Sequence, residues 1–495
     1  GYGMGAAGEA RNIAHQAKKM EIEEMRAFRD RFSIPVSDAE IEKIPFFKPD
    51  PKSREAEYLR ERVKALGSVP QRRRRSASLV VPELTAFEPQ TASTGEREIS
   101  TTMAFVRILN TIVRDHTIGA RVVPIVADES RTFGMEGMFR QLGIYSSVGQ
   151  LYHPQDAEQL MWYREDKLGQ ILQEGINEAG AFSSWIAAGT SYSNHDLPMI
   201  PFYIFYSMFG FQRIGDLAWA AGDMRTRGFL LGATSGRTTL NGEGLQHEDG
   251  QSQVAASFIP NCRSYDPTYS YEVATIIQDG LRRMLTEEED AYYYITLLNE
   301  NYAHPAMPEG SREGILRGMY LLRDGGGDAK SPRVQLFGSG AILREVSYAA
   351  DLLRDEWNVA ADVWSVTSFN ELQRDGVAAR RWNLLHPGDQ PRKSYVEQLL
   401  EGRKGPGIAA TDYIRTFAEQ IHPFVGRPYV TLGTDGYGRS DYRRKLREFF
   451  EVNRHWVTLA ALRALADEGA VDAKLVGKAI KKYEIDPNKP NPIAV

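Results

Sequence analysis

Short apolar stretches alternate with helical stretches through most of this chain, and this alternation constrains the fold more than any other feature. Between residues 99 and 305, four apolar stretches are predicted to be strands: 121–127, 199–206, 228–232 and 292–298. A second block begins with a predicted strand at 334–337, an amphipathic helix over 341–357 and a strand at 361–366. Strands that alternate with helices are typical of parallel sheets covered by helices. We therefore predict an α/β protein with two sheet domains.

Two glycines separate the strand at 334–337 from the helix that follows it. Gly338-Ser339-Gly340 invites comparison with a phosphate-binding loop, but the segment lacks both the Walker pattern and the full dinucleotide fingerprint. It is predicted to be a tight turn between strand and helix.

The composition excludes several classes of protein. The 495 residues are 42% hydrophobic and 25% charged, which is ordinary for a globular chain. The lone cysteine, Cys262, cannot form an internal disulfide or a cysteine-rich zinc site, so we expect a reducing compartment, the cytoplasm. A net charge of −5 gives no overall attraction to nucleic acid, and no stretch approaches the roughly 20 apolar residues of a membrane helix. We expect no nucleic acid or membrane partner.

Shifts in composition divide the chain. Residues 12–66 are charged and predicted to be helical, whereas residues 67–98 lack sustained periodicity and are predicted to be a linker. Passages rich in proline and glycine at 305–310 and 324–332 mark the next boundary. The expected divisions are 1–77, 78–307 and 308–495.

Two glutamates introduce the candidate site. Glu174 and Glu178 are four residues apart, so on a helix they would share one face. That face leads into the small, apolar segment 181–189, where a carboxylate is costly without a partner. One of the two is therefore expected to have a buried partner. The alternative is two solvent-facing carboxylates on an amphipathic helix.

Polar segments also follow three predicted strands. Residues 128–134 follow the first strand, and residues 205–216 close the second. After the third strand comes a long, glycine-rich loop, 234–250, in which His247 lies between acidic residues. Ligands of parallel-sheet proteins bind at the carboxyl ends of strands, and a loop of this length in a compact domain is more often functional than connective.

Several motifs carry a resemblance to one family. They are Asn-Ile-Ala-His-Gln (12–16), Gln-Glu-Gly-Ile-Asn-Glu (173–178), Phe-Tyr-Ser-Met-Phe-Gly-Phe-Gln-Arg (205–213), Gly-Glu-Gly-Leu-Gln-His-Glu-Asp-Gly (242–250) and Gly-Thr-Asp-Gly-Tyr-Gly-Arg-Ser-Asp (433–441). The chain resembles the homodimeric pyruvate dehydrogenase component of bacterial pyruvate dehydrogenase complexes, which belongs to the thiamin diphosphate enzymes of the transketolase superfamily. The resemblance covers essentially all 495 residues.

The resemblance implies an architecture. Residues 1–77 would be the tail of a diphosphate-binding domain with a mobile loop and a linker. Residues 78–307 would form a parallel-sheet, pyrimidine-binding domain, and residues 308–495 a C-terminal α/β domain of the transketolase type.

The resemblance also implies roles for the site residues. Glu178 would keep the aminopyrimidine ring of thiamin diphosphate in its reactive, protonated form, a task that suits a carboxyl group kept neutral by burial. Ile176 would separate the two cofactor rings, and Phe209 would stack on the aminopyrimidine. The residues implied to surround the thiazolium ring and the substrate are Tyr206, Glu243 and His247. Those implied to support the carboxylate network are Arg213, Asp128 and Glu129.

The implied reaction is the oxidative decarboxylation of pyruvate with reductive acetylation of a lipoyl group, which feeds acetyl-CoA synthesis. His15, on the N-terminal loop, would serve the transfer of the acetyl group. The implied partners are a second copy of the chain in a homodimer and the lipoyl domain and core of dihydrolipoyl acetyltransferase.

Magnesium is the one implied group for which the sequence offers no ligands. In the superfamily a Gly-Asp-Gly motif followed by a distant Asn binds the ion, and this sequence holds only near misses, at 215–217, 278–280, 374–376 and 434–436. By the resemblance the motif lies in an N-terminal diphosphate domain. No metal ligand is therefore expected in this chain, and the magnesium ligands are expected in that domain.

Two alternatives stay open. The chain could belong to a related thiamin enzyme, 2-oxoglutarate dehydrogenase or transketolase, although the segments that carry His15 and His247 favour the pyruvate enzyme. It could also be a catalytically incomplete, dimerising fragment, as the missing metal motif and a start at Gly1 without Met suggest.

Overall fold

The computed structural model describes most of the 495 residues, in two compact units. The described ranges are 4–5, 8–12, 19–67, 76, 78–127, 130–155, 163–327 and 331–495. The first unit comprises residues 1–71 and the second residues 72–495.

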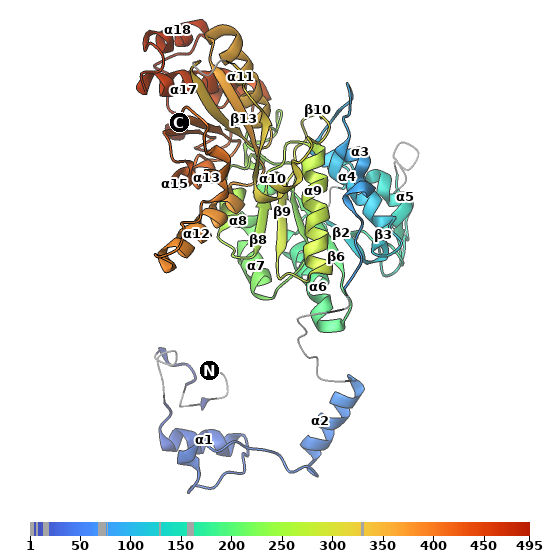
Figure 1. Cartoon of the computed structure of the whole chain (residues 1–495). Coiled ribbons are helices and arrows are strands. Elements are labelled where there is room, and N and C mark those ends of the chain that lie inside the picture. Colours follow the sequence, from blue (N-terminus) through green and yellow to red (C-terminus); the bar gives the residue numbers. More distant parts are fainter. Residues whose placement is uncertain are drawn as a thin grey trace. The chain divides into compact units, whose positions relative to one another are not determined.

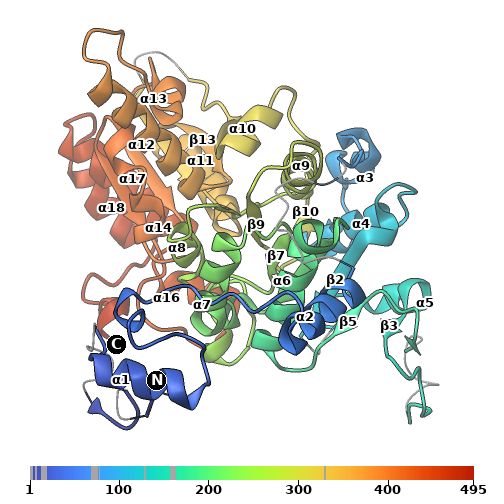
Figure 2. The same ribbon diagram turned by 90° about the horizontal axis from the view of Figure 1, so that it is seen from below.

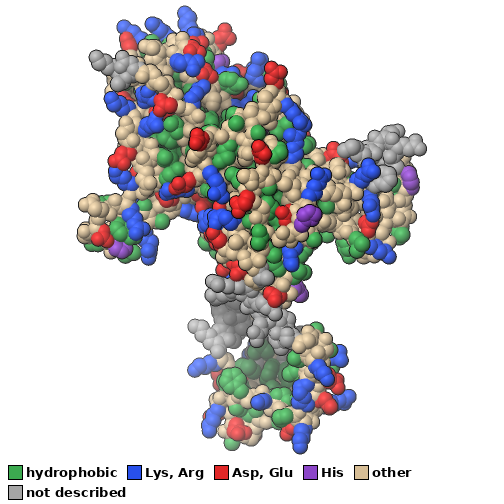
Figure 3. All heavy atoms as spheres, turned by 45° about the vertical axis from the view of Figure 1, so that its right-hand side comes forward, with side chains coloured by type: hydrophobic (Ala, Val, Ile, Leu, Met, Phe, Trp, Pro, Cys, Tyr) green, Lys and Arg blue, Asp and Glu red, His purple; other side chains and the backbone are tan. Residues whose placement is uncertain are grey.

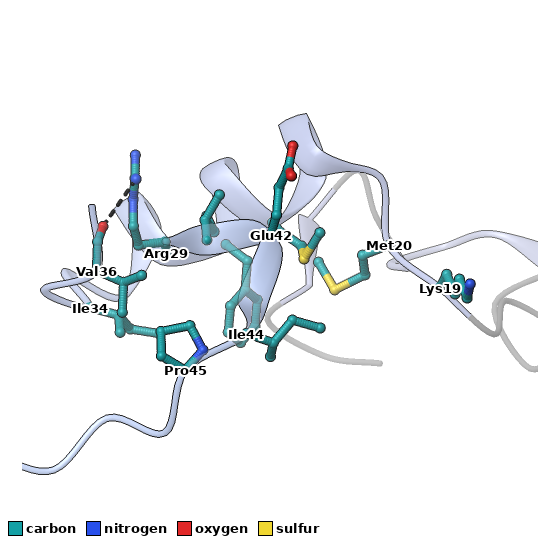
Figure 4. A pocket seen from close by; sticks show the side chains of 11 residues that line it. Lys19, Met20, Arg29, Ile34, Val36, Glu42, Ile44 and Pro45 are labelled. Carbon is teal, nitrogen blue, oxygen red and sulfur yellow. Dashed lines mark hydrogen bonds between the residues drawn. The ribbon is translucent and has the colours of Figure 1, made fainter. Parts of the chain in front are cut away.

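The first unit is helical, as its charged sequence predicted. Its helices are α1 (Ile22–Arg31) and α2 (Arg54–Ala65), and neither contains a buried residue. A pocket of about 570 Å³, shown in Figure 4, lies beside α1 and is lined mainly by apolar side chains. Arg29 at its rim donates from Nη1 to the carbonyl oxygen of Val36 at 3.1 Å.

A six-stranded, fully parallel sheet forms the first half of the second unit (Figure 1). In spatial order its strands are β5 (Leu172–Gln173), β2 (Val122–Val126), β6 (Ile200–Phe205), β7 (Phe229–Gly232), β9 (Tyr292–Thr296) and β8 (Cys262–Tyr265). The four strands predicted in this block are confirmed. β5 was not predicted because it has only two residues. β8 (Cys-Arg-Ser-Tyr) was not predicted because it lacks the apolar run that marks β7, which has the same length.

Helices cover both faces of this sheet, which explains why its strands are apolar at successive positions. In β6, Phe202 and Ile204 pack with α4 (Thr101–Val113) and α9 (Ser270–Leu281). Tyr203 and Phe205 point to the other face, where they pack with α6 (Glu178–His195), α7 (Phe211–Asp223) and α8 (Ser252–Ser257). α6 and α7 lie side by side (Figure 2).

A five-stranded sheet forms the second half of this unit. Its order is β11 (Met319–Arg323), β13 (Ala360–Val366), β12 (Arg333–Gly338), β14 (Gly407–Ala410) and β15 (Tyr429–Leu432). β11 is antiparallel to β13 and the other pairs are parallel. Both halves are therefore α/β, as predicted, with one antiparallel edge strand that the sequence pattern did not indicate.

Helices cover this second sheet on both faces as well. One face packs against α11 (Ile342–Trp357) and α17 (Arg454–Asp467), with α16 (Arg443–Phe449) and α18 (Lys474–Lys482) beside them. The other packs against α12 (Phe369–Leu385), α13 (Tyr395–Leu400), α14 (Thr416–Glu419) and α15 (His422–Val425). The core that contains α11 and α17 is continuous with the core beneath α4 and α9.

The structure confirms the predicted turn after β12 and corrects the predicted linker. Gly338-Ser339-Gly340 is the predicted tight turn: Gly340 has φ +48°, and a Cβ atom there would lie 2.6 Å from Asp266 Oδ2. The expected linker at 67–98 was partly wrong, because the short helices η4 (Leu84–Phe87) and α3 (Glu88–Thr91) pack against α9. Phe87 is fully buried, and this anchoring side chain outweighs the weak local pattern.

The surface carries charges of both signs. On the face drawn in Figure 3, basic and acidic side chains are interspersed, in keeping with the net charge of −5. Among the described residues, no helix has the length and apolar character that crossing a bilayer requires.

Candidate active site

The candidate site lies at the carboxyl edge of the six-stranded sheet. β5, β2, β6 and β7 are parallel neighbours, so the segments that follow them meet at one edge. These segments are the start of α6 after β5, the short helix η7 (Ser207–Phe209) with the start of α7 after β6, and the loop 233–250 after β7.

Glu178 is the first residue of α6. Asn177 caps this helix by accepting a hydrogen bond from the Gly180 backbone N–H at 3.0 Å. Glu178 Oε1 accepts from Arg213 Nη1 at 2.6 Å, and the glutamate side chain is 12% exposed. The resemblance implied a carboxyl group kept neutral by burial, whereas the structure gives Glu178 a cationic partner that is itself 48% exposed. The reason is that the starts of α6 and α7 lie side by side.

Three rings follow Arg213 in a series of contacts. The Arg213 guanidinium carbon lies 4.1 Å from the centroid of the Phe209 ring, which is cation–π geometry. The Phe209 and His247 ring centroids are 5.2 Å apart, as are those of His247 and Tyr206. The structure therefore brings together Glu178, Arg213, Phe209, His247 and Tyr206.

The loop 233–250 positions His247 because its first half is anchored in the core. Arg237 is buried and donates from Nη1 to the carbonyl oxygens of Thr434 and of Gly436, the latter at 2.6 Å. Asp412 accepts from the Thr238 backbone N–H at 3.0 Å and from Thr239 Oγ1 at 2.7 Å. His247 itself ends the short helix η8 (Leu245–His247), with Nδ1 3.3 Å from the Gly244 carbonyl oxygen.

The acidic residues that follow His247 are structural. Asp249 Oδ1 accepts from the backbone N–H groups of Gln251 and Ser252, each at 2.9 Å. Glu248 Oε2 accepts from the Arg439 backbone N–H at 2.6 Å. Burial raises the pKa of Glu248 to about 8. Both side chains lie in the protein interior, where they hold the backbone of the loop and of the segment around Arg439.

Glu174 differs from its predicted position. It follows β5 and precedes α6, so it does not share a helix face with Glu178, and that prediction was wrong. The chain turns at Gly175, where φ is +71°, before the helix begins. Glu174 Oε1 instead accepts from Ser184 Oγ at 2.5 Å. Both glutamates lie near the buried Tyr203: burial, together with the negative charges of Glu178 and Glu174, raises the pKa of Tyr203.

Two other predicted site residues, Ile176 and Glu243, form no hydrogen bond, ion pair or ring contact with the described residues of this cluster. Ile176 is 73% exposed, beside the start of α6. Glu243 is exposed, and its backbone carbonyl oxygen accepts from Ser440 Oγ at 2.5 Å. His15, Asp128 and Glu129 lie outside the described residues. The roles of these residues stay predictions.

Sequence reasoning missed three supporting residues. The ring of Phe133 is buried 5.5 Å from that of Tyr206, Ser184 holds Glu174, and Asp412 holds the loop. Phe133 lies in a segment that the sequence singled out, so its aromatic character was an available signal. Ser184 and Asp412 carried no signal, because only the fold brings them to their partners.

The side chains of this site suit the binding of a planar organic ring. A carboxylate, an aromatic ring and an imidazole follow one another in a series of contacts, from Glu178 through Arg213 to Phe209 and His247. A search of the described residues found no group of three or more His, Cys, Asp or Glu side chains suited to a metal ion.

Solved structures identify the class of fold. The chain is similar to transketolase from Campylobacter jejuni, with a TM-score of 0.58 and 15% identity over 93% of this chain and 61% of that one. It is also similar to transketolase from Leishmania mexicana, with a TM-score of 0.56 and 16% identity over 90% of this chain and 52% of that one. The protein therefore has a transketolase-like fold, with a parallel-sheet domain followed by a C-terminal α/β domain.

Sequence comparison narrows this class to one family. Residues 79–305 match the family described as pyruvate dehydrogenase E1 component middle domain, and residues 318–453 match the transketolase-like C-terminal domain. The pyruvate dehydrogenase E1 component of Pseudomonas aeruginosa is 64% identical over 100% of this chain, and that of Escherichia coli is 56% identical over 99%. The chain belongs to the pyruvate dehydrogenase E1 component family. It covers 56% and 55% of these two relatives, about half of their length.

Proposed function

We propose that this chain forms the pyrimidine-binding wall of a thiamin diphosphate site, in a protein that decarboxylates pyruvate and transfers the acetyl group to a lipoyl group. The observation that carries the proposal is the cluster of Glu178, Arg213, Phe209 and His247 at one sheet edge. The name of the relatives supports pyruvate as the substrate, rather than 2-oxoglutarate or a sugar phosphate.

The contacts of Arg213 support the fit to an aminopyrimidine. Its guanidinium is a planar group that lies over the Phe209 ring and donates an N–H to Glu178. An aminopyrimidine is likewise planar and bears N–H donors, so it suits the same two partners. When bound, thiamin diphosphate supplies a nucleophilic carbon and an electron sink for the loss of carbon dioxide from pyruvate.

Arg213 has to leave Phe209 before another ring can stack there. Its side chain is 48% exposed, so it can turn away without disturbing the core. This movement releases Glu178 Oε1, which can then share a proton with a ring nitrogen. In this proposal His247 and Tyr206 donate hydrogen bonds to the oxygens of pyruvate, where negative charge develops.

The remaining roles are proposals that rest on the family. Ile176 separates the cofactor rings, Glu243 lies toward the substrate, and Asp128 and Glu129 support the carboxylate network. His15 serves acetyl transfer to the lipoyl domain of dihydrolipoyl acetyltransferase. The working protein is a cytoplasmic homodimer, and its magnesium is held by residues outside this chain.

Replacement of Glu178 tests the proposal. In a protein that carries this chain together with the segment that precedes it in the relatives, Glu178→Gln should lower pyruvate turnover with an artificial electron acceptor by about 100- to 10,000-fold, because the ring nitrogen loses its acid–base partner. The melting temperature should change little, since Gln fills the same space.

Glu174→Gln is the matched control, because this neighbouring carboxylate binds Ser184 and not Arg213. It should keep turnover within a few-fold of the unmodified protein. Near-normal turnover in Glu178→Gln, or an equal loss in both variants, would refute the role assigned to Glu178.

A further inference from the structure

An arginine-lined groove of about 500 Å³ lies in the second unit. Glu300, which follows β9, meets residues of α11, α16 and the start of α17 there. Five arginines line the groove: Arg344, Arg443, Arg444, Arg447 and Arg454. The carboxylates of its lining are Glu300 and Glu345, so the groove has an excess of three positive charges. It shares no residue with the candidate active site. We call it the arginine groove.

Both carboxylates are already occupied by arginines. Glu300 Oε1 accepts from Arg344 Nη1 at 2.8 Å, and its Oε2 accepts from Arg447 Nη2. Glu345 accepts from Arg454 Nε at 2.9 Å and from Arg454 Nη2 at 3.0 Å. The glutamate side chains are 13% and 7% exposed, so these pairs form the inner wall. They fix the guanidinium groups of Arg344, Arg447 and Arg454 in place.

Arg443 and Arg444 supply two of the three excess charges, and the third arises because three arginines pair with only two glutamates. Arg443 donates from Nε to the Thr239 carbonyl oxygen at 2.5 Å and lies 4.0 Å from Glu300. Burial lowers the pKa of Arg443, and the positive charges of Arg447 and Arg344 also lower it. The negative charge of Glu300 acts in the opposite direction. Arg444 is exposed, and within the described part of the chain it forms no ion pair; its recorded contact is with the Tyr442 ring at 6.0 Å.

We infer that the arginine groove binds a small polyanion that contains a diphosphate or a longer phosphate chain. Guanidinium groups match phosphate oxygens through paired N–H donors, and arginines held in position lose little entropy on binding. A diphosphate carries about three negative charges near neutral pH, which equals the excess in the groove. The volume lies within the roughly 300–1,000 Å³ typical of small-molecule sites.

A single phosphate or an acidic peptide fits these observations less well. Orthophosphate brings at most about two negative charges and would leave one cation unpaired. A peptide would need three carboxylates on an extended backbone, whereas Arg443, Arg444 and Arg447 lie within about two turns of one helix.

Calorimetric titration of this chain with inorganic pyrophosphate tests the inference. The expected result is saturable binding that Arg444→Gln weakens by roughly tenfold to a hundredfold, since a charge-assisted hydrogen bond contributes about 1.5–3 kcal/mol. Arg444 is exposed, so this variant should fold normally. Binding should also weaken steeply as the salt concentration rises.

Arg463→Gln is the matched control, because Arg463 is an exposed arginine of α17 that pairs with Asp467 outside the groove. It should bind pyrophosphate like the unmodified chain. Absence of saturable binding, equal binding by Arg444→Gln, or equal affinity for orthophosphate or hexaglutamate would overturn the inference. None of these results depends on pyruvate turnover, so they are independent of the proposed function.

Discussion

Three buried carboxyl groups of this protein have raised pKa values. Burial raises the pKa of Glu248 to about 8, of Asp266 to about 7 and of Asp412 to about 6. An ionised carboxylate is less stable in the interior than in water, so the folded chain retains these protons to a higher pH than the unfolded chain does. Each group therefore favours folding most below the pKa of the unfolded state and less as the pH rises through the pKa of the folded state.

Glu248→Gln should make stability less dependent on pH. In the unmodified chain, the free energy of unfolding should decrease between pH 4.5, the ordinary pKa of the group, and about pH 8. Gln carries no proton to lose, so we expect the stability of the variant relative to the unmodified chain to increase from pH 4.5 to 8 by up to about 5 kcal/mol, since one pH unit between two pKa values corresponds to about 1.4 kcal/mol. Urea unfolding from pH 4.5 to 8.5 measures this.

The control for this prediction is Glu468→Gln, at an exposed glutamate, which should follow the unmodified chain at every pH. A Glu248→Gln variant whose stability falls as steeply with pH as that of the unmodified chain would contradict the prediction.

At the scale of elements, the loop 233–250 is held by the C-terminal sheet domain. Asp412, two residues after β14, accepts from Thr238 and Thr239, and Arg237 reaches the carbonyl oxygens of Thr434 and Gly436. The position of His247 therefore depends on a domain that contributes no residue to the ring cluster.

Asp412→Ala should loosen this loop. The buried N–H of Thr238 and hydroxyl of Thr239 would lose their acceptor, which we expect to lower the free energy of unfolding by about 2–4 kcal/mol. Hydrogen exchange in residues 234–250 should become faster, as mass spectrometry can measure. Asp389→Ala, at an exposed aspartate, should change neither quantity. An unchanged exchange rate in the loop of Asp412→Ala would show that other contacts hold it.

At the scale of the whole molecule, the two sheets of the second unit share one core. Apolar residues beneath α4 and α9 are continuous with those beneath α11 and α17. A buried carboxylate also joins the halves: Glu272 of α9 accepts from Tyr320 of β11 and Ser365 of β13, each at 2.7 Å. Burial raises the pKa of Glu272.

This shared core predicts cooperative unfolding of the second unit. In hydrogen exchange at increasing urea, peptides from β6 and β13 should lose protection at the same urea concentration, because opening one sheet exposes the core of the other. Peptides from α1, which has no buried residue, should exchange at lower urea. Loss of protection in β13 well before β6 would instead indicate two independent domains.

The sequence by itself determined the class of fold and the longer strands. Strands such as β2 and β6 are apolar at successive positions because both faces of their sheet are covered, and the residue types alone therefore indicate this burial. Family motifs likewise singled out Glu178, Phe209, Tyr206, Arg213 and His247. The strands β5, β8, β11, β14 and β15 were not predicted, because each has only two to five residues, which carry little periodic signal and no signal of direction.

Only the tertiary structure determined which partner each charged side chain contacts. Glu178 pairs with Arg213 because the starts of α6 and α7 lie side by side, and Glu174 turns to Ser184 because the helix begins after it. The five arginines of the groove come from three helices, and no spacing along the chain predicted their convergence. Burial of an apolar side chain depends mainly on its own chemistry, whereas the partner of a charge depends on which distant segments become neighbours.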